Sequence, residues 1–261
     1  MSLHPTSVIA PTAQIPDSCI IGPFCVIGGD VVLGENCELV SHVVLDGHLT
    51  LGAGCKVYSF AALGISPQDL KYAGEPTRVT IGERTVIRES VTISRGTVLG
   101  GGHTTVGSDC LIMAYTHIGH DSHIGNGCIL ANAATLAGHV TVEDYATVGA
   151  LCPVHQHCRI GTHAYIGGGT TITQDVLPFS LTCIERNNHA YGLNKVGMMR
   201  RGFTPDDLAQ LRSSYRLLVG GKHNTTQALE LIREKLSTGE FGPHVQYLVD
   251  FVASADRGII K

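Results

Sequence analysis

The sequence predicts a parallel β-helix followed by a small helical region. Three observations predict it: an aliphatic residue recurs at every sixth position, small residues recur with the same period, and the pattern ends near Pro178. An amphipathic helix would space its apolar residues by 3 and 4, and an ordinary strand by 2, so neither explains a period of six. A solenoid in which each six-residue unit supplies one short strand and one turn does explain it.

The aliphatic positions, called anchors below, run in three stretches. Three hexads are expected to close one coil of 18 residues, and the glycine that often follows an anchor is expected to serve the turn. The gap between Leu63 and Ile81 predicts a loop that leaves the wall of the solenoid, and a single extra residue near 101–103 shifts the register. The anchors are Ile9, Ile15, Ile21, Ile27, Leu33, Leu39, Leu45, Leu51, Val57 and Leu63, then Ile81, Ile87, Ile93 and Leu99, then Val106, Ile112, Ile118, Ile124, Leu130, Leu136, Val142, Val148, Val154, Ile160, Ile166 and Ile172.

Eight of the nine cysteines lie four residues after an anchor. Alanine and valine fill the same slot in other hexads, so the position favours a small buried group, and cysteine serves as one. We therefore expect packing rather than disulfides or zinc binding, because the chain contains no C-x-x-C pair. The eight are Cys19, Cys25, Cys37, Cys55, Cys110, Cys128, Cys152 and Cys158, and Cys183 is the exception.

Helical signals replace the hexads after Val176. Thr204 followed by Pro205 predicts the capped start of a helix that ends at Gly220, and Thr225 or Thr226 opens a second helix. A third is expected from Pro243 to about Ala255. The predicted domains are a β-helix over residues 1–181, which carries the site, and an α-helical C-terminal domain over residues 182–261.

The composition excludes several classes of protein. The chain has no Trp and only 5% aromatic residues, which predicts a core of aliphatic and small side chains. A formal net charge of -4 argues against a general nucleic-acid binder. The N-terminus does not resemble a signal peptide, and no apolar stretch reaches the ~18 residues of a membrane span, so we expect a cytoplasmic protein.

A coil of 18 residues lets the sequence be read in columns, because residues n and n+18 stack about 4.8 Å apart. One column contains His120, Gly138 and Gln156; the next contains Asp121, His139 and His157; a third contains Gly119, Ala137 and His155. Imidazoles stacked beside a carboxylate suit proton transfer, so these columns predict a catalytic site. Polar turn histidines without a function are the alternative.

Metal binding is a competing hypothesis for these histidines. Some prism-shaped β-helices hold zinc with three histidines, and the gamma-class carbonic anhydrases resemble a pattern with an H-x-x-x-x-H pair. The close pairs of this sequence, such as His117/His120 and His157/His163, have other spacings. We expect no metal, while ligands gathered from separate coils remain the open alternative.

Seven segments carry a resemblance to a known family over nearly the whole chain. The chain resembles the UDP-N-acetylglucosamine acyltransferases, which catalyse the first step of lipid A synthesis. The resemblance implies a left-handed coil, a homotrimer with active sites between subunits, and transfer of a 3-hydroxyacyl group from acyl carrier protein to the 3-hydroxyl of the sugar. The segments are SHVVLDGH (41–48), QDLKYAGEPTRV (68–79), IRESVTISRGT (87–97), THIGHD (116–121), LAGHV (136–140), VHQ (154–156) and MRRGF (199–203).

The chemistry that the resemblance implies also makes sense residue by residue. A sugar hydroxyl is a poor nucleophile at neutral pH, so a general base must take its proton, and His120 is the candidate. Asp121 is expected to orient this imidazole, and the Gly138 N–H to stabilise the oxyanion of the tetrahedral intermediate. Because the eight in-phase cysteines belong to the packing slot, no acyl-enzyme and no cofactor are expected beyond the phosphopantetheine of the carrier protein.

The resemblance also implies substrate-binding positions. Asp69 and Lys71 lie in the gap between Leu63 and Ile81 and are expected to contact the sugar or its phosphates. Gly168 matches the position that limits the length of the acyl chain, and without a side chain it should admit a longer one. The remaining expected contacts are His117, His139, His155 and Gln156 for the sugar and acyl region, and Asn194, Arg200 and Arg201 for the nucleotide and diphosphate.

Two alternatives remain open at the level of sequence. One is a related hexad enzyme that acylates another acceptor, such as a 3-amino sugar. The other is a non-catalytic trimer that only binds acyl carrier protein, against which the H-I-x-H-D box argues.

Overall fold

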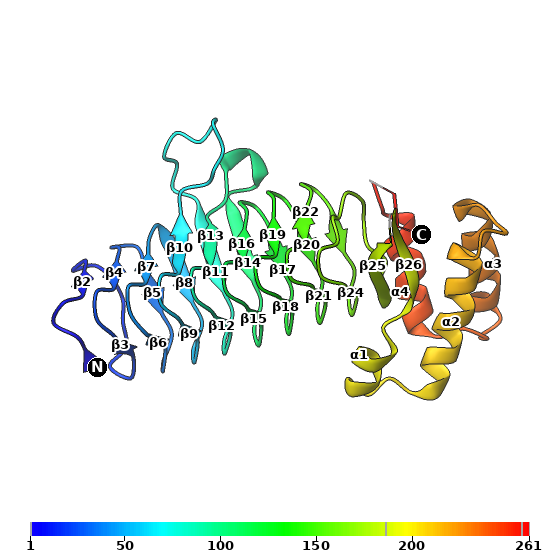
Figure 1. Ribbon diagram of the computed structural model, residues 1–261, viewed down its shortest axis with the longest axis horizontal. Helices are drawn as coiled ribbons and strands as arrows, with labels where there is room; N and C mark the ends of the chain where they lie inside the picture. Colours follow the sequence, from blue (N-terminus) through cyan, green and yellow to red (C-terminus); the bar gives the residue numbers. More distant parts are fainter. Residues whose placement is uncertain (1, 186, 257, 261) are drawn as a thin grey trace.

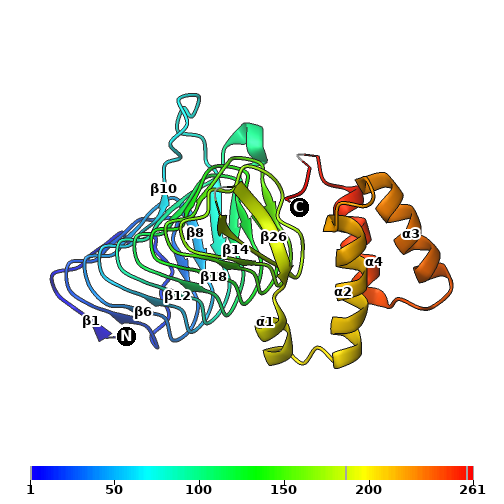
Figure 2. The same cartoon turned by 45° about the vertical axis from the view of Figure 1, so that its right-hand side comes forward.

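A computed structural model describes residues 2–185, 187–256 and 258–260 of the chain. Short strands form three sheets that run along one axis as the faces of a triangular prism, and the helices stand at its C-terminal end (Figures 1 and 2). The predicted left-handed parallel β-helix with a helical C-terminal region is confirmed.

Successive strands of the coils go to sheets A, B and C in turn. Sheet A contains β1 (Ser2–Leu3), β3 (Ile20–Ile21), β6 (Glu38–Leu39), β9 (Lys56–Val57), β12 (Val86–Ile87), β15 (Leu111–Ile112), β18 (Ile129–Leu130), β21 (Thr147–Val148), β24 (Tyr165–Ile166), β25 (Ser180–Glu185) and β26 (Asn187–Leu193). Sheet B contains β2 (Val8–Ile9), β4 (Val26–Ile27), β7 (Val44–Leu45), β10 (Ala62–Ile65), β13 (Thr92–Ser94), β16 (His117–Ile118), β19 (Thr135–Leu136) and β22 (Pro153–Val154). Sheet C contains β5 (Val32–Leu33), β8 (His48–Leu51), β11 (Arg78–Ile81), β14 (His103–Val106), β17 (His123–Ile124), β20 (Thr141–Val142) and β23 (Arg159–Ile160).

The anchors fill the interior of the prism. Ile118 pairs with Leu136 and Leu136 with Val154, 18 positions apart as predicted, and all three side chains are buried. Because the second residue of each two-residue strand points inward while the first points outward, one anchor per hexad supplies the core.

The eight in-phase cysteines are free and buried, which confirms that they pack the core. Several of them also hydrogen-bond the next coil: the Cys37 thiol donates to the Gly52 carbonyl at 3.2 Å, and the Cys55 thiol to the Gly82 carbonyl at 3.0 Å. A thiol in this slot therefore fills space and satisfies a carbonyl of the turn. The side chain of Cys183 lies outside the described residues.

Two insertions interrupt the period of 18, and both follow a strand of sheet B. The first separates β10 from β11 and contains residues 66–77 as predicted. The second separates β13 from β14 and contains the 3-10 helix η1 (Val98–Gly100). Two expectations are wrong here: Leu99 is 80% exposed rather than an anchor, and Ile81 pairs with Val106, so the insertion is longer than one extra residue.

The C-terminal end of the coils is closed by a hairpin and by helices. Strand β25 pairs parallel with β24, and β26 then pairs antiparallel with β25. The three predicted helices are confirmed as α2 (Pro205–Val219), α3 (Thr225–Ser237) and α4 (Pro243–Ala253), while α1 (Lys195–Arg200) and the hairpin were not predicted. The predicted domain boundary between residues 181 and 182 falls within β25. Among the described residues, the search for a helix long and apolar enough to cross a lipid bilayer finds none.

His163 joins the coils to the helical region through stacked rings. It is 8% exposed, and its ring centroid lies 4.9 Å from that of Tyr145 and 5.0 Å from that of Phe203. Burial, followed by electrostatic repulsion from Arg201 and His244, lowers the pKa of His163 to about 4. The imidazole is therefore neutral in the folded protein over a pH range in which an unfolded chain would protonate it.

This burial predicts a loss of stability in weak acid. Since the unfolded state binds the proton below its ordinary pKa of about 6.5 and the folded state does not, the free energy of unfolding should fall by roughly 3 kcal/mol as the pH drops from 6.5 to 4. The His163→Phe variant should lack this pH-dependent decrease in the free energy of unfolding. Urea denaturation of the wild type and the variant at pH 7 and pH 4.5 measures the decrease in each. Equal losses in the two proteins would contradict the assignment.

Candidate active site

The turns that lead from sheet B to sheet C form one edge of the prism, called the BC corner below. The turns after β16, β19 and β22 bring residues 119–121, 137–139 and 155–157 to this edge, and both insertions, 66–77 and 95–102, project from it (Figure 1). Stacking of successive coils therefore collects side chains that are far apart in the sequence.

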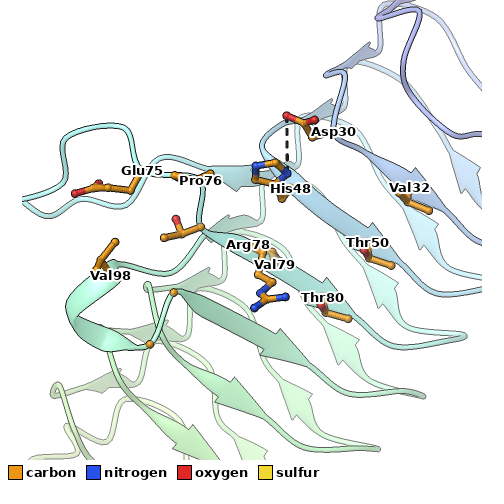
Figure 3. Close-up of a pocket in the computed structure, with 13 residues that line it drawn as sticks. Asp30, Val32, His48, Thr50, Glu75, Pro76, Arg78, Val79, Thr80 and Val98 are labelled. Carbon is orange, nitrogen blue, oxygen red and sulfur yellow. Dashed lines mark ion pairs between the residues drawn. The ribbon is translucent and has the colours of Figure 1, made fainter.

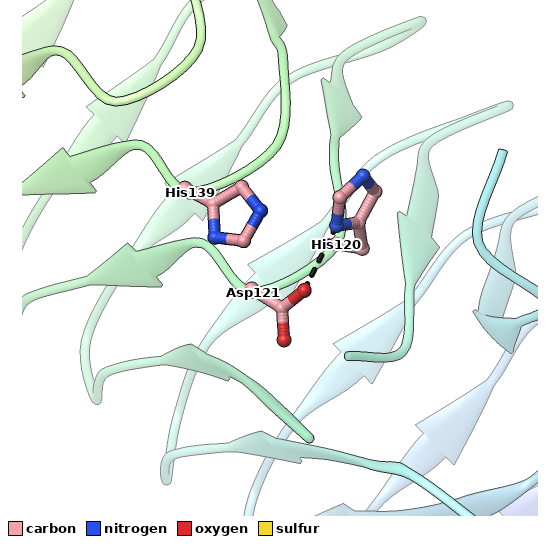
Figure 4. A group of neighbouring side chains, drawn as sticks. All are labelled: His120, Asp121 and His139. Carbon is pink, nitrogen blue, oxygen red and sulfur yellow. Dashed lines mark hydrogen bonds and ion pairs between the residues drawn. The ribbon is translucent and has the colours of Figure 1, made fainter. Parts of the chain in front are cut away.

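His120 and Asp121 form the centre of this corner (Figure 4). The distance between His120 Nδ1 and Asp121 Oδ2 is 2.9 Å, and the Asp121 side chain is fully buried while that of His120 is 17% exposed. With Nδ1–H donating to the carboxylate, the Nε2 lone pair of His120 is left to accept a proton. The pair has the geometry of a base and the group that orients it.

Asp121 is held by residues that the sequence did not single out. The Thr97 N–H donates to both carboxylate oxygens at 2.9 and 3.0 Å, and the Thr97 hydroxyl donates to Oδ2 at 2.7 Å. The Asp121 N–H in turn donates to the Thr104 hydroxyl at 2.8 Å. Burial raises the pKa of Asp121, but the hydrogen bonds from Thr97 and His120 outweigh burial and hold it below its ordinary value. The carboxylate is therefore charged at neutral pH.

Gly138 lies against the face of His120, one coil away. A Cβ atom at Gly138 would stand 2.6 Å from His120 Cε1 and 2.7 Å from Nε2, so only glycine fits beside this ring. The Gly138 N–H has no acceptor among the residues that the structure describes. An unpaired donor beside a base is the arrangement that stabilises an oxyanion.

The other histidines of the columns surround this pair. The ring of His139 makes an edge contact with His120 at 5.1 Å and stacks on His157 at 4.5 Å. Burial lowers the pKa of His139, although the Asp121 carboxylate acts in the opposite direction. The pKa of His117 is also lowered, by burial and then by His120, and its Nδ1 lies 2.8 Å from the Thr92 hydroxyl. The imidazoles of His117 and His139 are therefore neutral at physiological pH.

The other predicted residues of the BC corner lie in the turn after β22 and in the first insertion. His155 follows β22, and its Nδ1 lies 3.1 Å from the carbonyl of Gln156. Within the insertion, the Lys71 N–H donates to the Asp69 carboxylate at 2.9 Å. Asp69 is close enough to His139 to act on its pKa in the raising direction. The structure thus brings the insertion and the histidine columns together.

Three predicted nucleotide contacts lie at a different edge, where sheet C turns into sheet A. The Asn194 amide donates to the His163 carbonyl at 3.0 Å and caps α1, and the Arg201 guanidinium lies 4.1 Å from the centroid of the Tyr145 ring. Asn194, Arg200 and Arg201 line a hollow of about 270 Å³ at this edge. Sheet C separates them from the BC corner within one chain.

Gly168 lies at the third edge of the prism, in the turn after β24 of sheet A. The nearest atom to a Cβ placed there would be the Ala150 carbonyl oxygen at 3.3 Å, so the position is open on most sides. The predicted site residues therefore occupy three different edges of a single chain.

The BC corner also contains a group that a metal ion could bind. One ligand atom each of His120, Asp121 and His139 lies within 4.8 Å of the others. Asp121, however, already accepts hydrogen bonds from Thr97 and His120, which suits an orienting carboxylate better than a metal ligand.

A larger pocket of about 740 Å³ opens on sheet C between the two insertions (Figure 3). It is lined by Glu75 and Pro76 from the first insertion, by Val98 from the second, and by residues of β5, β8 and β11 of sheet C. Asp30 and His48 form an ion pair across its far wall at 3.9 Å. The insertions thus form the walls of a hollow adjoining the BC corner.

Comparison with known proteins gives concordant matches. The chain matches the model of the second domain of UDP-N-acetylglucosamine O-acyltransferases over residues 175–260, and that of bacterial transferase hexapeptide repeats over residues 12–47 and 103–138. It is 38% identical to the UDP-N-acetylglucosamine acyltransferase of Francisella novicida, with a TM-score of 0.94, over 99% of this chain and 93% of the other. The corresponding enzyme of Moraxella catarrhalis matches at 37% identity and TM-score 0.94 over 100% of both chains, and that of Arabidopsis at 31% and 0.84 over 99% and 100%.

A prism of hexapeptide repeats with imidazoles and a buried carboxylate at one edge defines the class of hexapeptide-repeat acyltransferases. Within that class, identity across nearly the whole length of solved relatives decides the family. The chain belongs to the UDP-N-acetylglucosamine O-acyltransferase family, and it is an acyltransferase.

Proposed function

We propose that this enzyme transfers a 3-hydroxyacyl group from acyl carrier protein to the 3-hydroxyl of UDP-N-acetylglucosamine, the first step of lipid A biosynthesis. The observation that carries the proposal is the arrangement of His120, Asp121 and Gly138 in a chain of this family. A base with a fixed tautomer and an unpaired N–H beside it are the two groups that acyl transfer to a hydroxyl requires.

The proposed reaction is a direct transfer. His120 Nε2 takes the proton of the sugar hydroxyl while its oxygen forms a bond to the thioester carbonyl carbon. The carbonyl oxygen becomes an oxyanion, which the Gly138 N–H stabilises until the carbon–sulfur bond breaks. The leaving thiolate of the phosphopantetheine arm then receives the proton from His120. No acyl-enzyme is needed, in agreement with thiols that are all buried at the eight packing positions.

The distribution of the predicted substrate contacts supports a homotrimer. Asn194, Arg200 and Arg201 line the edge between sheets C and A, on the other side of sheet C from His120. A neighbouring subunit would bring this edge to the BC corner, so that one subunit supplies the nucleotide contacts and the other supplies Asp69, Lys71, His117, His139, His155 and Gln156. Free cysteines agree with a reducing compartment, and we infer that the enzyme acts in the cytoplasm.

One experiment tests this function directly. Purified protein is incubated with UDP-N-acetylglucosamine and 3-hydroxyacyl carrier protein, and the product is identified by mass spectrometry. We expect a mono-O-acylated sugar nucleotide, with no change on addition of a metal chelator. If only a 3-amino analogue of the sugar nucleotide is acylated, the protein is a related enzyme with another acceptor. If no donor gives a product, the remaining interpretation is a non-catalytic scaffold that binds acyl carrier protein.

Gly168 predicts the length of the acyl chain. Because position 168 has no side chain and a Cβ there would meet little beyond the Ala150 carbonyl, this turn should leave room for a longer acyl chain. Each additional CH₂ buried is worth about 0.8 kcal/mol, so kcat/KM should rise about fourfold for each CH₂ that the protein can still bury. A series of carrier-protein donors from short to long measures this, and a preference for short donors would contradict it.

A further inference from the structure

Arg95 follows β13 at the BC corner and reaches across the base of the insertion that contains Asp69 and Lys71. Its side chain is only 14% exposed. The Nη1 group donates to the Gly64 carbonyl at 3.0 Å, and Nη2 donates to the Ser66 hydroxyl at 3.1 Å. These contacts fix residues 64–66, the segment through which the chain leaves sheet B and enters the insertion.

The same guanidinium also holds residues 72–75, the segment through which the insertion returns toward sheet C. Its Nε donates to the Tyr72 hydroxyl at 2.8 Å, and that hydroxyl donates to the Glu75 carbonyl at 2.7 Å. One planar cation thus joins residues on both sides of Asp69 and Lys71. Only an arginine presents donors in such a fork, whereas lysine offers a single point of attachment.

The surroundings are built for this side chain. A Cβ atom at Gly47, two coils earlier, would stand 2.5 Å from Arg95 Nη1, so that turn leaves the space that the guanidinium fills. The contact with Asp46 is longer, at 3.5 Å, and the Asp46 side chain is 56% exposed, so this ion pair adds little. The half-buried hydrogen bonds to Gly64 and Tyr72, together with the exposed one to Ser66, therefore carry the anchoring.

We propose that Arg95 is a positioning residue for the sugar nucleotide: it holds residues 66–77 in the conformation that presents Asp69 and Lys71 to the histidine columns. The inference rests on the proposed function, because it assumes that these two residues contact that substrate. The donors of the Arg95 guanidinium are directed into the base of the insertion, to Gly64, Ser66 and Tyr72. If the loop is already ordered in the free enzyme, the free energy of substrate binding is not reduced by the entropic cost of ordering the loop.

The test compares Arg95→Gln with Arg88→Gln, a matched control in the same coil. Arg88 directly follows β12 of sheet A, its side chain is 44% exposed, and among the described residues that side chain contacts the neighbouring Glu89 and the Tyr58 ring. In Arg95→Gln we expect the KM for UDP-N-acetylglucosamine to rise about tenfold or more, while kcat changes less than about threefold. Arg95→Lys should fall between the wild type and Arg95→Gln, and Arg88→Gln should match the wild type.

A second measurement reads the loop without any substrate. Trypsin cleavage after Lys71 should be several-fold faster in Arg95→Gln than in the wild type or in Arg88→Gln, because cleavage requires the loop to open. Circular dichroism and light scattering establish that each variant is folded and assembled. Faster cleavage together with a higher KM supports the proposal.

Three results would overturn it. Unchanged cleavage with a raised KM would mean that Arg95 acts on the substrate directly. Faster cleavage with an unchanged KM would mean that the order of the loop does not serve binding, and no change in either would remove the anchoring role. If instead the wild-type protein forms no acylated UDP-N-acetylglucosamine, the proposed function fails, while the cleavage rates still decide whether Arg95 anchors the loop.

Discussion

Replacing His120 by alanine is expected to lower kcat for acyl transfer by about 10²–10⁴-fold, with little change in the KM for either substrate. The reason lies in the proton that the attacking hydroxyl must lose. Asp121, itself held by Thr97, lies 2.9 Å from His120 Nδ1, which in the proposed mechanism leaves Nε2 of His120 to accept that proton. The ring of His139 meets His120 at its edge, whereas Gly138 lies against the face of His120.

His123→Ala provides a matched control for this substitution. His123 lies three residues further along the same coil, on the outer face of sheet C, where its Nδ1 is 3.0 Å from the Thr105 hydroxyl. Its removal should leave kcat within about twofold, because it contacts none of the groups in the proposed mechanism. Turnover is measured by steady-state kinetics with saturating donor. A His120→Ala protein that keeps near-normal turnover in an intact assembly would refute the assignment of the base.

The sequence predicted those features that depend on the period alone. Each coil repeats the same backbone, so the anchors, the cysteine slot and the stacking of His120, Gly138 and Gln156 could be read by counting. The starts of α2 and α4 were equally local, since Pro205 and Pro243 act within a few residues. Local chemistry and strict repetition therefore gave most of the fold.

At the BC corner, the contacts that the sequence did not predict involve the two insertions. Thr97 lies 24 positions before Asp121 and Arg95 lies 23 positions after Tyr72, so neither pair obeys the spacing of 18. The segment that contains both was recognised as part of a family motif, but a motif gives no partner for a side chain. Ile81 pairs with Val106, 25 positions on, rather than with a residue 18 positions on. The additional residues form the second insertion, and this insertion places Thr97 at the BC corner.

The glycines that follow the anchors were expected to serve the turn, and the structure shows how several of them do so. Gly22, Gly28 and Gly34 have no unusual positive φ. The left-handed turn positions are occupied by other residues, among them Phe24 and His139 as well as glycines such as Gly54. What several of these glycines provide is close approach, because the next coil lies where a Cβ would be.

Gly22→Ala should therefore destabilise the β-helix by about 3 kcal/mol, which lowers the Tm by roughly 6–12 °C. The new Cβ would stand 1.8 Å from the Val40 carbonyl oxygen, and a backbone atom fixed by its own coil cannot move aside as a side chain can. Gly28→Ala is the matched control, since it occupies the same slot one hexad later. Its Cβ would lie closest to the Asp46 carboxylate, at 3.1 Å, and would meet the Leu45 carbonyl oxygen at an ordinary contact distance of 3.4 Å. Because the Asp46 side chain is 56% exposed and its contact with Arg95 is a long one, at 3.5 Å, it can shift, and this variant should lose less than about 0.5 kcal/mol. Thermal unfolding followed by circular dichroism compares the two, and equal Tm values would show that close approach does not explain the glycine slot.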